Sequence, residues 1–407
     1  MLKVVFLFLD MGIRLNKQIL SVLLIWGQAA IHASANSVPS EYPLCVDGKS
    51  ISDTVMTKYG PLRRLFDYFE EANKEKKDKA FDFSVIAGPH YSGDTKFGIG
   101  MVAAGLYHTD RNDTILPPSN ISFYGDVSTI GYYLLGVRGN HLFPHDNYRL
   151  NYNLYFYSFP GLYWGRGYEH GANPENESEY KRLQAQVRAD FMFRISKKLY
   201  LGPMIVFDHV AGRDFEKEEL LEGMDPRTTN VGFGLSVLYD SRDFLTNAYK
   251  GYYLRIDQRI SPSFLSSKYA FGSTEFTACS YHTVWKGGVV AGQFHTQLNY
   301  GEVPWGLMAT LGGAYSMRGY YEGRYRDKCA MDAQIELRQH VWKRNGVAVW
   351  MGAGTVFPAF SGLLARHVLP NYGIGYRWEF KKRVNVRLDL GFGKHQTGFI
   401  FNVNEAF

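Results

Sequence analysis

Apolar and polar residues alternate with a period of two along most of the chain after residue 80. In residues 251–260, one face carries Tyr252, Leu254 and Ile256, and the other carries Arg255, Asp257 and Arg259. The same alternation covers residues 181–194 and 384–393. Because successive side chains of a strand point to opposite faces, this period predicts β-strands with one apolar face.

The composition of the two faces indicates where these strands lie. The polar faces carry arginines and carboxylates, and the apolar faces are rich in aromatic residues. Each segment is about ten residues long, which matches a tilted strand that crosses a bilayer. Such strands must close on themselves, because lipid offers no hydrogen-bond partner to an open edge. The pattern therefore predicts an all-β fold, an antiparallel transmembrane β-barrel with its polar side chains inside.

We expect sixteen strands in this barrel, and an even number places both ends of the barrel on the periplasmic side. The last strand, 399–407, would direct Phe399, Phe401 and Phe407 toward lipid. The expected strands cover residues 81–90, 97–107, 119–128, 131–142, 148–157, 181–195, 198–211, 229–240, 250–261, 268–284, 287–301, 330–341, 346–357, 371–381, 383–393 and 399–407.

Residues 1–35 are typical of a signal peptide. Two basic residues precede an apolar run over 19–31, and small residues follow at Ala33-Ser34-Ala35. This order of charged, apolar and small residues predicts export and cleavage after Ala35. Residues 36–80 then form a short periplasmic segment before the barrel, which covers 81–407. One amphipathic helix is expected in that segment from the spacing of Leu62, Leu65, Phe66 and Phe69.

The composition excludes several other classes of protein. The 407 residues include 42 Gly and 29 Tyr, and 16% are aromatic, which argues against disorder. The 45 basic and 39 acidic residues are spread along the chain, whereas a nucleic-acid-binding protein would cluster its basic residues. The three cysteines lie far apart, without the spacing of a zinc site or a disulfide framework. We expect no cofactor, no metal and no nucleic-acid partner.

One connection, residues 302–329, is much longer than a tight turn and contains Arg318-Gly319-Tyr320. With four other stretches it resembles the BamA/TamA superfamily of outer-membrane assembly barrels, also called the bacterial surface antigen family, over residues 81–407. The other stretches are a strand–turn–strand motif with Asp240, Arg242, Asp243 and Gly251, a Glu336–Arg338 segment, and the closing strands Gly373–Trp378 and Arg387–Gly393.

The resemblance implies that the long loop folds back into the lumen. Arg318 would then meet the inward Glu336, with Arg338 and Asp389 as second partners. A bidentate contact between the guanidinium and the carboxylate would hold the loop across the channel.

Two neighbours of Arg318 have implied roles as well. Gly319 would allow the backbone to turn tightly, and Tyr320 would stack on the wall or hydrogen-bond to it. The family has an inward Asp in the next strand, where this chain has Gly352, so Glu336 is expected to carry most of the charge compensation. Assembly members of the family also have POTRA domains before the barrel, and residues 36–80 are too few for one such domain.

These residues favour a transport or assembly function over catalysis. No G-x-S-x-G motif occurs, and no Ser or Asp has a His at a suggestive spacing, so we expect no enzyme. A diffusion porin would explain the size and the polar interior but not the loop motif. We expect a barrel of the Gram-negative outer membrane that assists insertion or export of outer-membrane or surface components. The alternative is a channel or conduit for lipids or small solutes.

The expected partners follow from this location. They are the outer-membrane lipids, the outer-membrane assembly machinery, and unidentified protein or lipid substrates. A terminal strand with Phe399, Phe401 and Phe407 is expected to be the signal that the assembly machinery reads. We also expect the edge between strands 81–90 and 399–407 to be weak, because Gly391, Gly393 and Gly398 offer it no cross-strand packing.

Overall fold

The computed structural model describes residues 45–46, 49–50, 81–92, 96–110, 116, 118–265 and 268–407. The chain divides into two units, Met1–Tyr68 and Phe69–Phe407. In the first unit, Cys45–Val46 (β1) pairs antiparallel with Lys49–Ser50 (β2). The expected signal peptide and the expected amphipathic helix lie outside the described residues.

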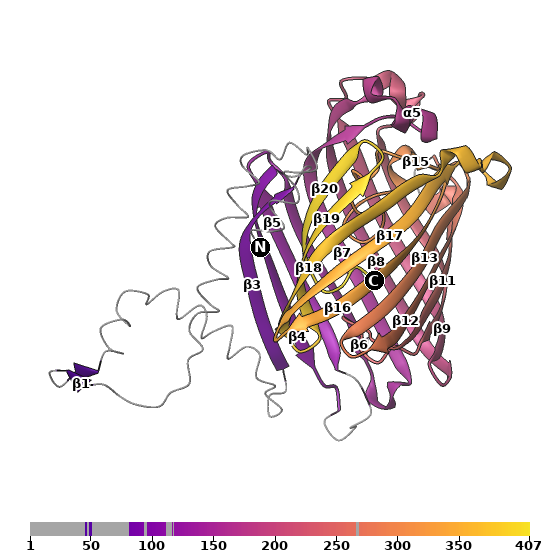
Figure 1. The fold of residues 1–407 in the computed structure, drawn as a ribbon. Helices are drawn as coiled ribbons and strands as arrows, with labels where there is room; N and C mark the ends of the chain where they lie inside the picture. Colours follow the sequence, from indigo (N-terminus) through magenta and orange to yellow (C-terminus); the bar gives the residue numbers. More distant parts are fainter. Residues whose placement is uncertain are drawn as a thin grey trace. The chain divides into compact units, whose positions relative to one another are not determined.

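The second unit is built on one antiparallel sheet (Figure 1). Its strands lie in sequence order, and β13 pairs with β16 across the long connection between them. The prediction of an all-β fold is confirmed. Within the described residues, no helix is long and apolar enough to span a membrane.

The strands of the sheet are β3 (Phe81–Ser92), β4 (Lys96–Tyr107), β5 (Ser119–Ser128), β6 (Tyr133–Leu142), β7 (Tyr148–Tyr163), β8 (Ser178–Ser196), β9 (Leu199–Arg213), β10 (Arg227–Asp240), β11 (Gly251–Ser261), β12 (Phe271–Trp285), β13 (Gly288–Gly301), β16 (Cys329–Trp342), β17 (Asn345–Phe357), β18 (Leu369–Lys381), β19 (Val384–Gly393) and β20 (Gln396–Val403). The connections hold α5 (Tyr168–Ala172), the paired strands β14 (Ala309–Thr310) and β15 (Arg326–Asp327), and the 3-10 turns Pro144–Asp146, Pro174–Asn176, Glu218–Leu221, Ser263–Leu265, Trp305–Leu307, Phe360–Gly362 and Ala365–His367.

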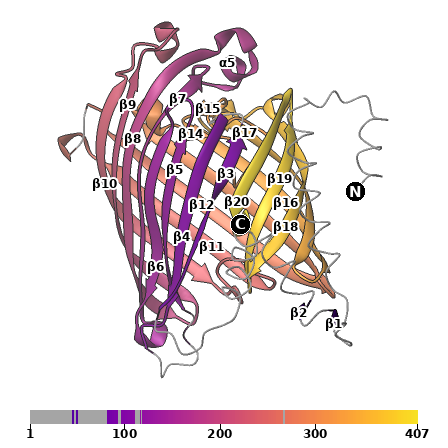
Figure 2. The ribbon, with the colours of Figure 1, turned by 90° about the vertical axis from the view of Figure 1, so that its left-hand side faces the viewer.

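The two ends of the sheet differ in the length of their connections (Figure 2). One end, called the turn end here, has two-residue hairpins in which Lys198, Gly287, Lys343 and Arg383 have positive φ. A two-residue hairpin requires positive φ to match the twist of its strands. The opposite end, called the loop end, has long connections at 164–177, 214–226, 302–328 and 358–368. The loop end therefore carries most of the residues outside the sheet.

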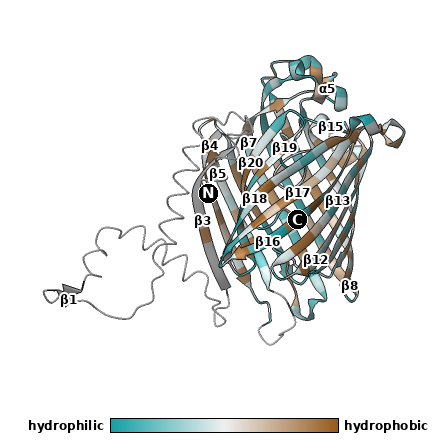
Figure 3. Cartoon of the chain, in the orientation of Figure 1, coloured by the Kyte–Doolittle hydropathy of each residue, from teal (hydrophilic) through white to brown (hydrophobic). Residues whose placement is uncertain are grey.

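Hydrophilic and hydrophobic residues are interspersed along the strands, as the colours of the ribbon illustrate (Figure 3). On β18, Tyr372, Ile374 and Tyr376 are exposed on the outer face, whereas Asn371 and Arg377 are buried on the inner face. The alternation predicted from the sequence is thus present, with apolar side chains outside and polar side chains inside. This arrangement suits a sheet whose outer face contacts lipid.

The chain after β20 differs from the prediction. The last strand ends at Val403, not at residue 407, because Asn404 has a left-handed backbone with a φ of 71°. Glu405 is buried and accepts hydrogen bonds from Arg377 and Asn385. The expected strand over 399–407 is therefore too long.

The predicted orientation of Phe407 is also wrong. Its ring packs against Tyr281 and lies beneath the Arg338 guanidinium, at 5.2 Å, both on the inner face. Phe399 and Phe401 are exposed on the outer face as expected. The alternation fails at Phe407 because the turn at Asn404 redirects the chain inward.

Candidate functional site

The long connection between β13 and β16 packs against the inner face of the sheet. β14 pairs with β15 inside this connection and gives it a short ladder of its own. An apolar cluster joins the loop to the strands and to α5, with members Tyr168, Ala309, Leu311, Met317, Tyr320, Tyr325, Ala330, Val356 and Leu369. The loop is thus held by packing as well as by polar contacts.

The backbone of the loop approaches the sheet most closely at Gly319. This residue has a φ of 117°, and a Cβ on it would lie 2.6 Å from the carbonyl carbon of Gly391. A Cβ on Gly398 would in turn lie 3.1 Å from the Cα of Gly319. Side chains at these positions would separate the loop from β19 and β20. The glycines of the closing strands therefore serve to receive the loop.

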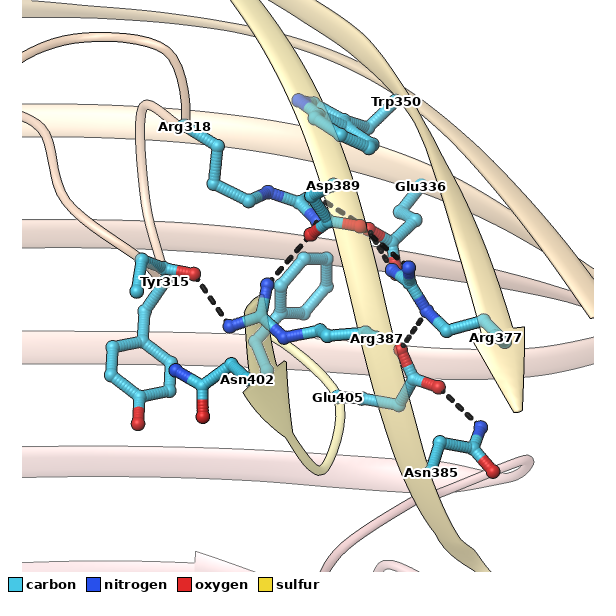
Figure 4. Close-up of polar contacts among 12 residues, drawn as sticks. Tyr315, Arg318, Glu336, Trp350, Arg377, Asn385, Arg387, Asp389, Asn402 and Glu405 are labelled. Atoms are coloured by element: carbon cyan, nitrogen blue, oxygen red, sulfur yellow. Dashed lines mark hydrogen bonds and ion pairs between the residues drawn. The ribbon is translucent and has the colours of Figure 1, made fainter. Parts of the chain in front are cut away.

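Arg318 is completely buried and bridges two carboxylates from different strands (Figure 4). Its Nη2 lies 2.6 Å from Glu336 on β16, and its Nη1 lies 2.8 Å from Asp389 on β19. Nη2 also donates to Gln334 at 3.3 Å. The guanidinium carbon lies 3.7 Å from the ring centroid of Trp350, so the cation is covered on one side by an indole.

Further charged residues extend this contact into a network. We call the loop cluster the set Arg318, Glu336, Arg338, Arg377, Arg387, Asp389 and Glu405. Arg377 on β18 donates to Asp389 and, at 2.8 Å, to Glu405. Arg387 on β19 donates to Asp389 at 2.7 Å and to the carbonyl of Ala314 in the loop at 2.6 Å. The cluster therefore links the loop to three strands and to the segment after β20.

The two carboxylates at the centre have equivalent surroundings. Glu336 lies near Arg318, Arg338 and Arg377, and Asp389 contacts Arg318, Arg377 and Arg387. The expectation that Glu336 carries most of the charge compensation is thus wrong, because Asp389 shares it. Gly352 has no space for a carboxylate, since a Cβ there would lie 2.5 Å from the carbonyl oxygen of Ala333.

The remaining predicted residues of the loop motif also have defined contacts. Tyr320 donates from its hydroxyl to the carbonyl of Pro370 at 2.7 Å and accepts from the backbone of Lys394 at 2.7 Å. Arg338 contacts Glu336 at 2.7 Å and does not reach Arg318 directly. It donates instead to the carbonyl of Phe407 at 2.9 Å.

Sequence reasoning missed several residues of the site: Gln334, Trp350, Asn371, Arg377, Arg387 and Glu405. Asn371 donates to the carbonyl of Arg318 and so fixes the loop backbone. Arg377 and Arg387 lie at inward positions of the predicted closing strands. The alternation of polar and apolar residues along these strands could therefore have identified them. Glu405 had no such signal, because the turn at Asn404 interrupts the alternation.

The strand–turn–strand motif lies at the turn end, away from the loop. Arg242 donates to both oxygens of Asp240, at 3.0 and 2.8 Å. Asp243 accepts from the backbone of Tyr249 and Lys250 and from Arg383, at 2.8, 3.2 and 2.8 Å. Partial burial alone would raise the pKa of Asp243, but these donors outweigh it and hold the pKa below its ordinary value. Gly251 has a φ of 108°.

A second ion-pair network lies on strands β8 to β12. We call the wall network the set Arg188, Asp190, Asp208, Arg255, Asp257, Arg259 and Glu275. Arg188 contacts Asp257 and, at 3.1 Å, Glu275. Arg255 contacts Asp190 at 2.7 Å, and Arg259 contacts Asp208 at 2.8 Å. These pairs join strand to strand and include no residue of the loop.

The fold and the site together define a protein class. An apolar outer face, a charged inner face and a long loop held to that face by a buried arginine are features of an outer-membrane β-barrel. The chain belongs to the Omp85 superfamily, because the model of the Omp85 superfamily domain matches residues 132–400. It is thus a β-barrel protein of the Gram-negative outer membrane, and the resemblance to the BamA/TamA superfamily is confirmed. Its family acts in outer-membrane protein insertion or secretion.

Solved structures share the fold at low sequence identity. BamA from Haemophilus ducreyi lacking POTRA domains 1–3 matches with a TM-score of 0.52 and 14% identity, over 79% of this chain and 70% of that one. CdiB from Acinetobacter baumannii matches with a TM-score of 0.51 and 13% identity, over 80% of this chain and 60% of that one. CdiB from Escherichia coli matches with a TM-score of 0.52 and 12% identity, over 80% of this chain and 62% of that one. This chain thus spans about three fifths of the CdiB chains. No curated protein matches it.

Proposed function

We propose that this protein assists the insertion or export of an outer-membrane or surface component, with the loop over 302–328 acting as a retained plug. The observation that carries the proposal is the complete burial of Arg318 between Glu336 and Asp389. A loop that merely lined an open pore would have no need of a desolvated cation at its tip, because burial of a charge is costly unless it is paired.

The proposal includes closure of the sheet into a barrel of sixteen strands through contact between β3 and β20. In support, Cα atoms of these two terminal strands approach within 8 Å. Among the described strands, no hydrogen-bond ladder joins them, and β20 has only 8 residues, whereas β3 has 12. A short seam without such a ladder would suit lateral opening toward lipid.

Disulfide trapping tests the seam. Cysteine pairs placed along β3 and β20 in several registers should crosslink in the native outer membrane, because only close strands meet the geometric limits of a disulfide. Pairs placed across β7 and β8, which have an extended ladder, are the positive control. If every β3–β20 register fails while the control succeeds, the barrel is not closed at this seam.

The assembly function itself is tested by replacing the native copy with Arg318→Ala and quantifying the outer-membrane and surface proteome. We expect a defined set of proteins to decrease while the level of the variant stays near that of the wild type. Lys181→Ala, which removes an exposed pair with Asp214, is the matched control. An unchanged proteome together with co-purification of no client would refute the assembly function.

A conduit for small solutes or lipids is the second candidate. In its favour, the inner face of β7 retains partly exposed polar and aromatic side chains, including Asn153, Tyr155 and Tyr157. Steady conductance in planar bilayers by the wild-type protein, with the Arg318 contact intact, would favour the conduit. A closed wild type that conducts only as Arg318→Ala would favour the plug.

A further inference from the structure

The connection between β17 and β18 carries an apolar tip whose side chains stay largely exposed. Phe360, Leu363, Leu364 and Val368 are 64%, 40%, 40% and 46% exposed. In Figure 1 this gold segment projects sideways from the loop end, whereas α5 continues in the direction of the strands. A cluster of exposed apolar side chains on a soluble surface would mark an interaction site.

The base of this connection is well anchored. His367 stacks on Tyr168 with ring centroids 4.3 Å apart and contacts Glu169 at 2.9 Å. Two turns order the tip, where Gly362 donates to Ala359 at 2.8 Å and His367 donates to Leu364 at 3.0 Å. The exposed apolar residues are thus presented by a structured segment with a fixed base.

The apolar tip is continuous with the lipid-facing surface of the sheet. On the two strands that it connects, Met351, Tyr372 and Ile374 are exposed on the outer face. Tyr372 is near the loop end of β18, where an aromatic side chain suits the boundary between lipid and water. From this side the loop extends the same apolar surface outward.

We propose that residues 358–368 insert Phe360, Leu363 and Leu364 into the outer leaflet of the bilayer as an interfacial anchor. The occupant of this surface is lipid, because the tip adjoins a surface that already faces lipid and projects to the side of the barrel. The anchor fixes the β17–β18 wall at the membrane boundary. This inference rests on the outer-membrane location and not on the identity of the substrate.

Site-directed spin labelling tests the anchor in the full chain, reconstituted in phosphatidylcholine and phosphatidylglycerol liposomes. Labels are placed with Phe360→Cys and Leu363→Cys in a Cys45→Ser background, where Cys279 and Cys329 remain buried. Ile374→Cys is the lipid-facing control, and Lys268→Cys, at an 84% exposed side chain, is the aqueous control. An apolar face that lies about 5–10 Å below the headgroup boundary should favour oxygen over an aqueous nickel complex.

We expect the oxygen-to-nickel accessibility ratio at both loop positions to exceed that at Lys268→Cys several-fold and to approach that at Ile374→Cys. A ratio equal to that of Lys268→Cys would overturn the proposal and leave the tip as a surface for a protein partner. A second readout needs no label. Phe360→Asp/Leu363→Asp should expose Arg366 to trypsin in liposomes, whereas the wild type is protected. Equal cleavage of both proteins would contradict insertion.

Discussion

The loop cluster and the wall network use the same side chains on the same face of the sheet, but in different settings. Every side chain of the loop cluster that contacts Arg318 is fully buried, as Arg318 is itself. In the wall network, the side chains of Arg188, Arg255 and Arg259 are 26%, 15% and 13% exposed. The loop cluster also joins the loop to the sheet, whereas the wall network joins strands of the sheet to one another.

This difference decides how each network responds to a substitution. A buried ion pair contributes little net stability when it forms, but removal of one partner leaves an uncompensated charge that costs about 3–5 kcal/mol. A partly hydrated pair loses less, because water replaces the missing partner. We infer that the loop cluster specifies the position of the loop, while the wall network adjusts the local potential of the interior.

The largest effect is expected for Arg318→Ala. Two carboxylates lose a shared cation, so the loop should be released at a cost of about 3–5 kcal/mol. Single-channel conductance should rise, and residues 314–326 should become sensitive to added protease. The double variant Arg318→Ala/Glu336→Ala should be little worse than either single variant. Strictly additive effects would show that the two side chains do not act as a pair.

The two central carboxylates provide the next test. Because each contacts three arginines, Glu336→Gln and Asp389→Asn should increase conductance by similar amounts, each at a cost of about 1–3 kcal/mol. Protease sensitivity of the loop, measured in both variants at the same salt concentration, checks this equality. A clearly larger effect of Glu336→Gln would restore the role that the sequence alone suggested.

The sequence predicts most of the sheet, because alternation repeats in nearly every strand and is a local property. It also predicts Arg318, Glu336 and Asp389, through a family resemblance rather than through spacing. It does not predict that Asp389 and Glu336 share the charge equally, since this depends on Arg377 and Arg387 from two other strands. The inward turn at Asn404 is likewise missed, because a single left-handed residue leaves no pattern in a strand of alternating residues.

A smaller effect is expected at the edge of the loop cluster. Phe407→Ala removes the ring between Tyr281 and Arg338, and a half-buried aromatic ring contributes about 1–2 kcal/mol. The melting temperature should fall by a few degrees. Phe401→Ala, on the exposed outer face, should keep its melting temperature but lower the amount of folded protein in the outer membrane. If Phe407→Ala instead lowers the amount of folded protein and leaves the melting temperature unchanged, the assembly signal is assigned to Phe407.

In the wall network, Arg188→Gln should cost about 1 kcal/mol or less, because Asp257 keeps its pair with Arg255 and water reaches the partly exposed Glu275. Conductance and protease resistance of the loop should stay near those of the wild type. Thermal unfolding at low and high salt separates the two networks, since salt screens partly exposed pairs more strongly. If Arg188→Gln releases the loop as Arg318→Ala does, the two networks are coupled and do not act independently.

The smallest effect is expected at Asp243, in the turn between β10 and β11, where the carboxylate that pairs with Arg383 is 32% exposed. Its donors hold the pKa of Asp243 below the ordinary value of about 3.9. The folded state therefore gains stability above that ordinary pKa and loses it as the pH falls through the lower pKa of the folded protein.

The contribution of Asp243 to stability should stay below about 1 kcal/mol, because solvent screens the pair. Thermal unfolding between about pH 2 and pH 6 should show a shallow acid-side decline, and Asp243→Asn should flatten part of it. An unchanged decline in the variant would place the acid sensitivity in the buried carboxylates instead, and would extend the contrast in burial to the response to pH.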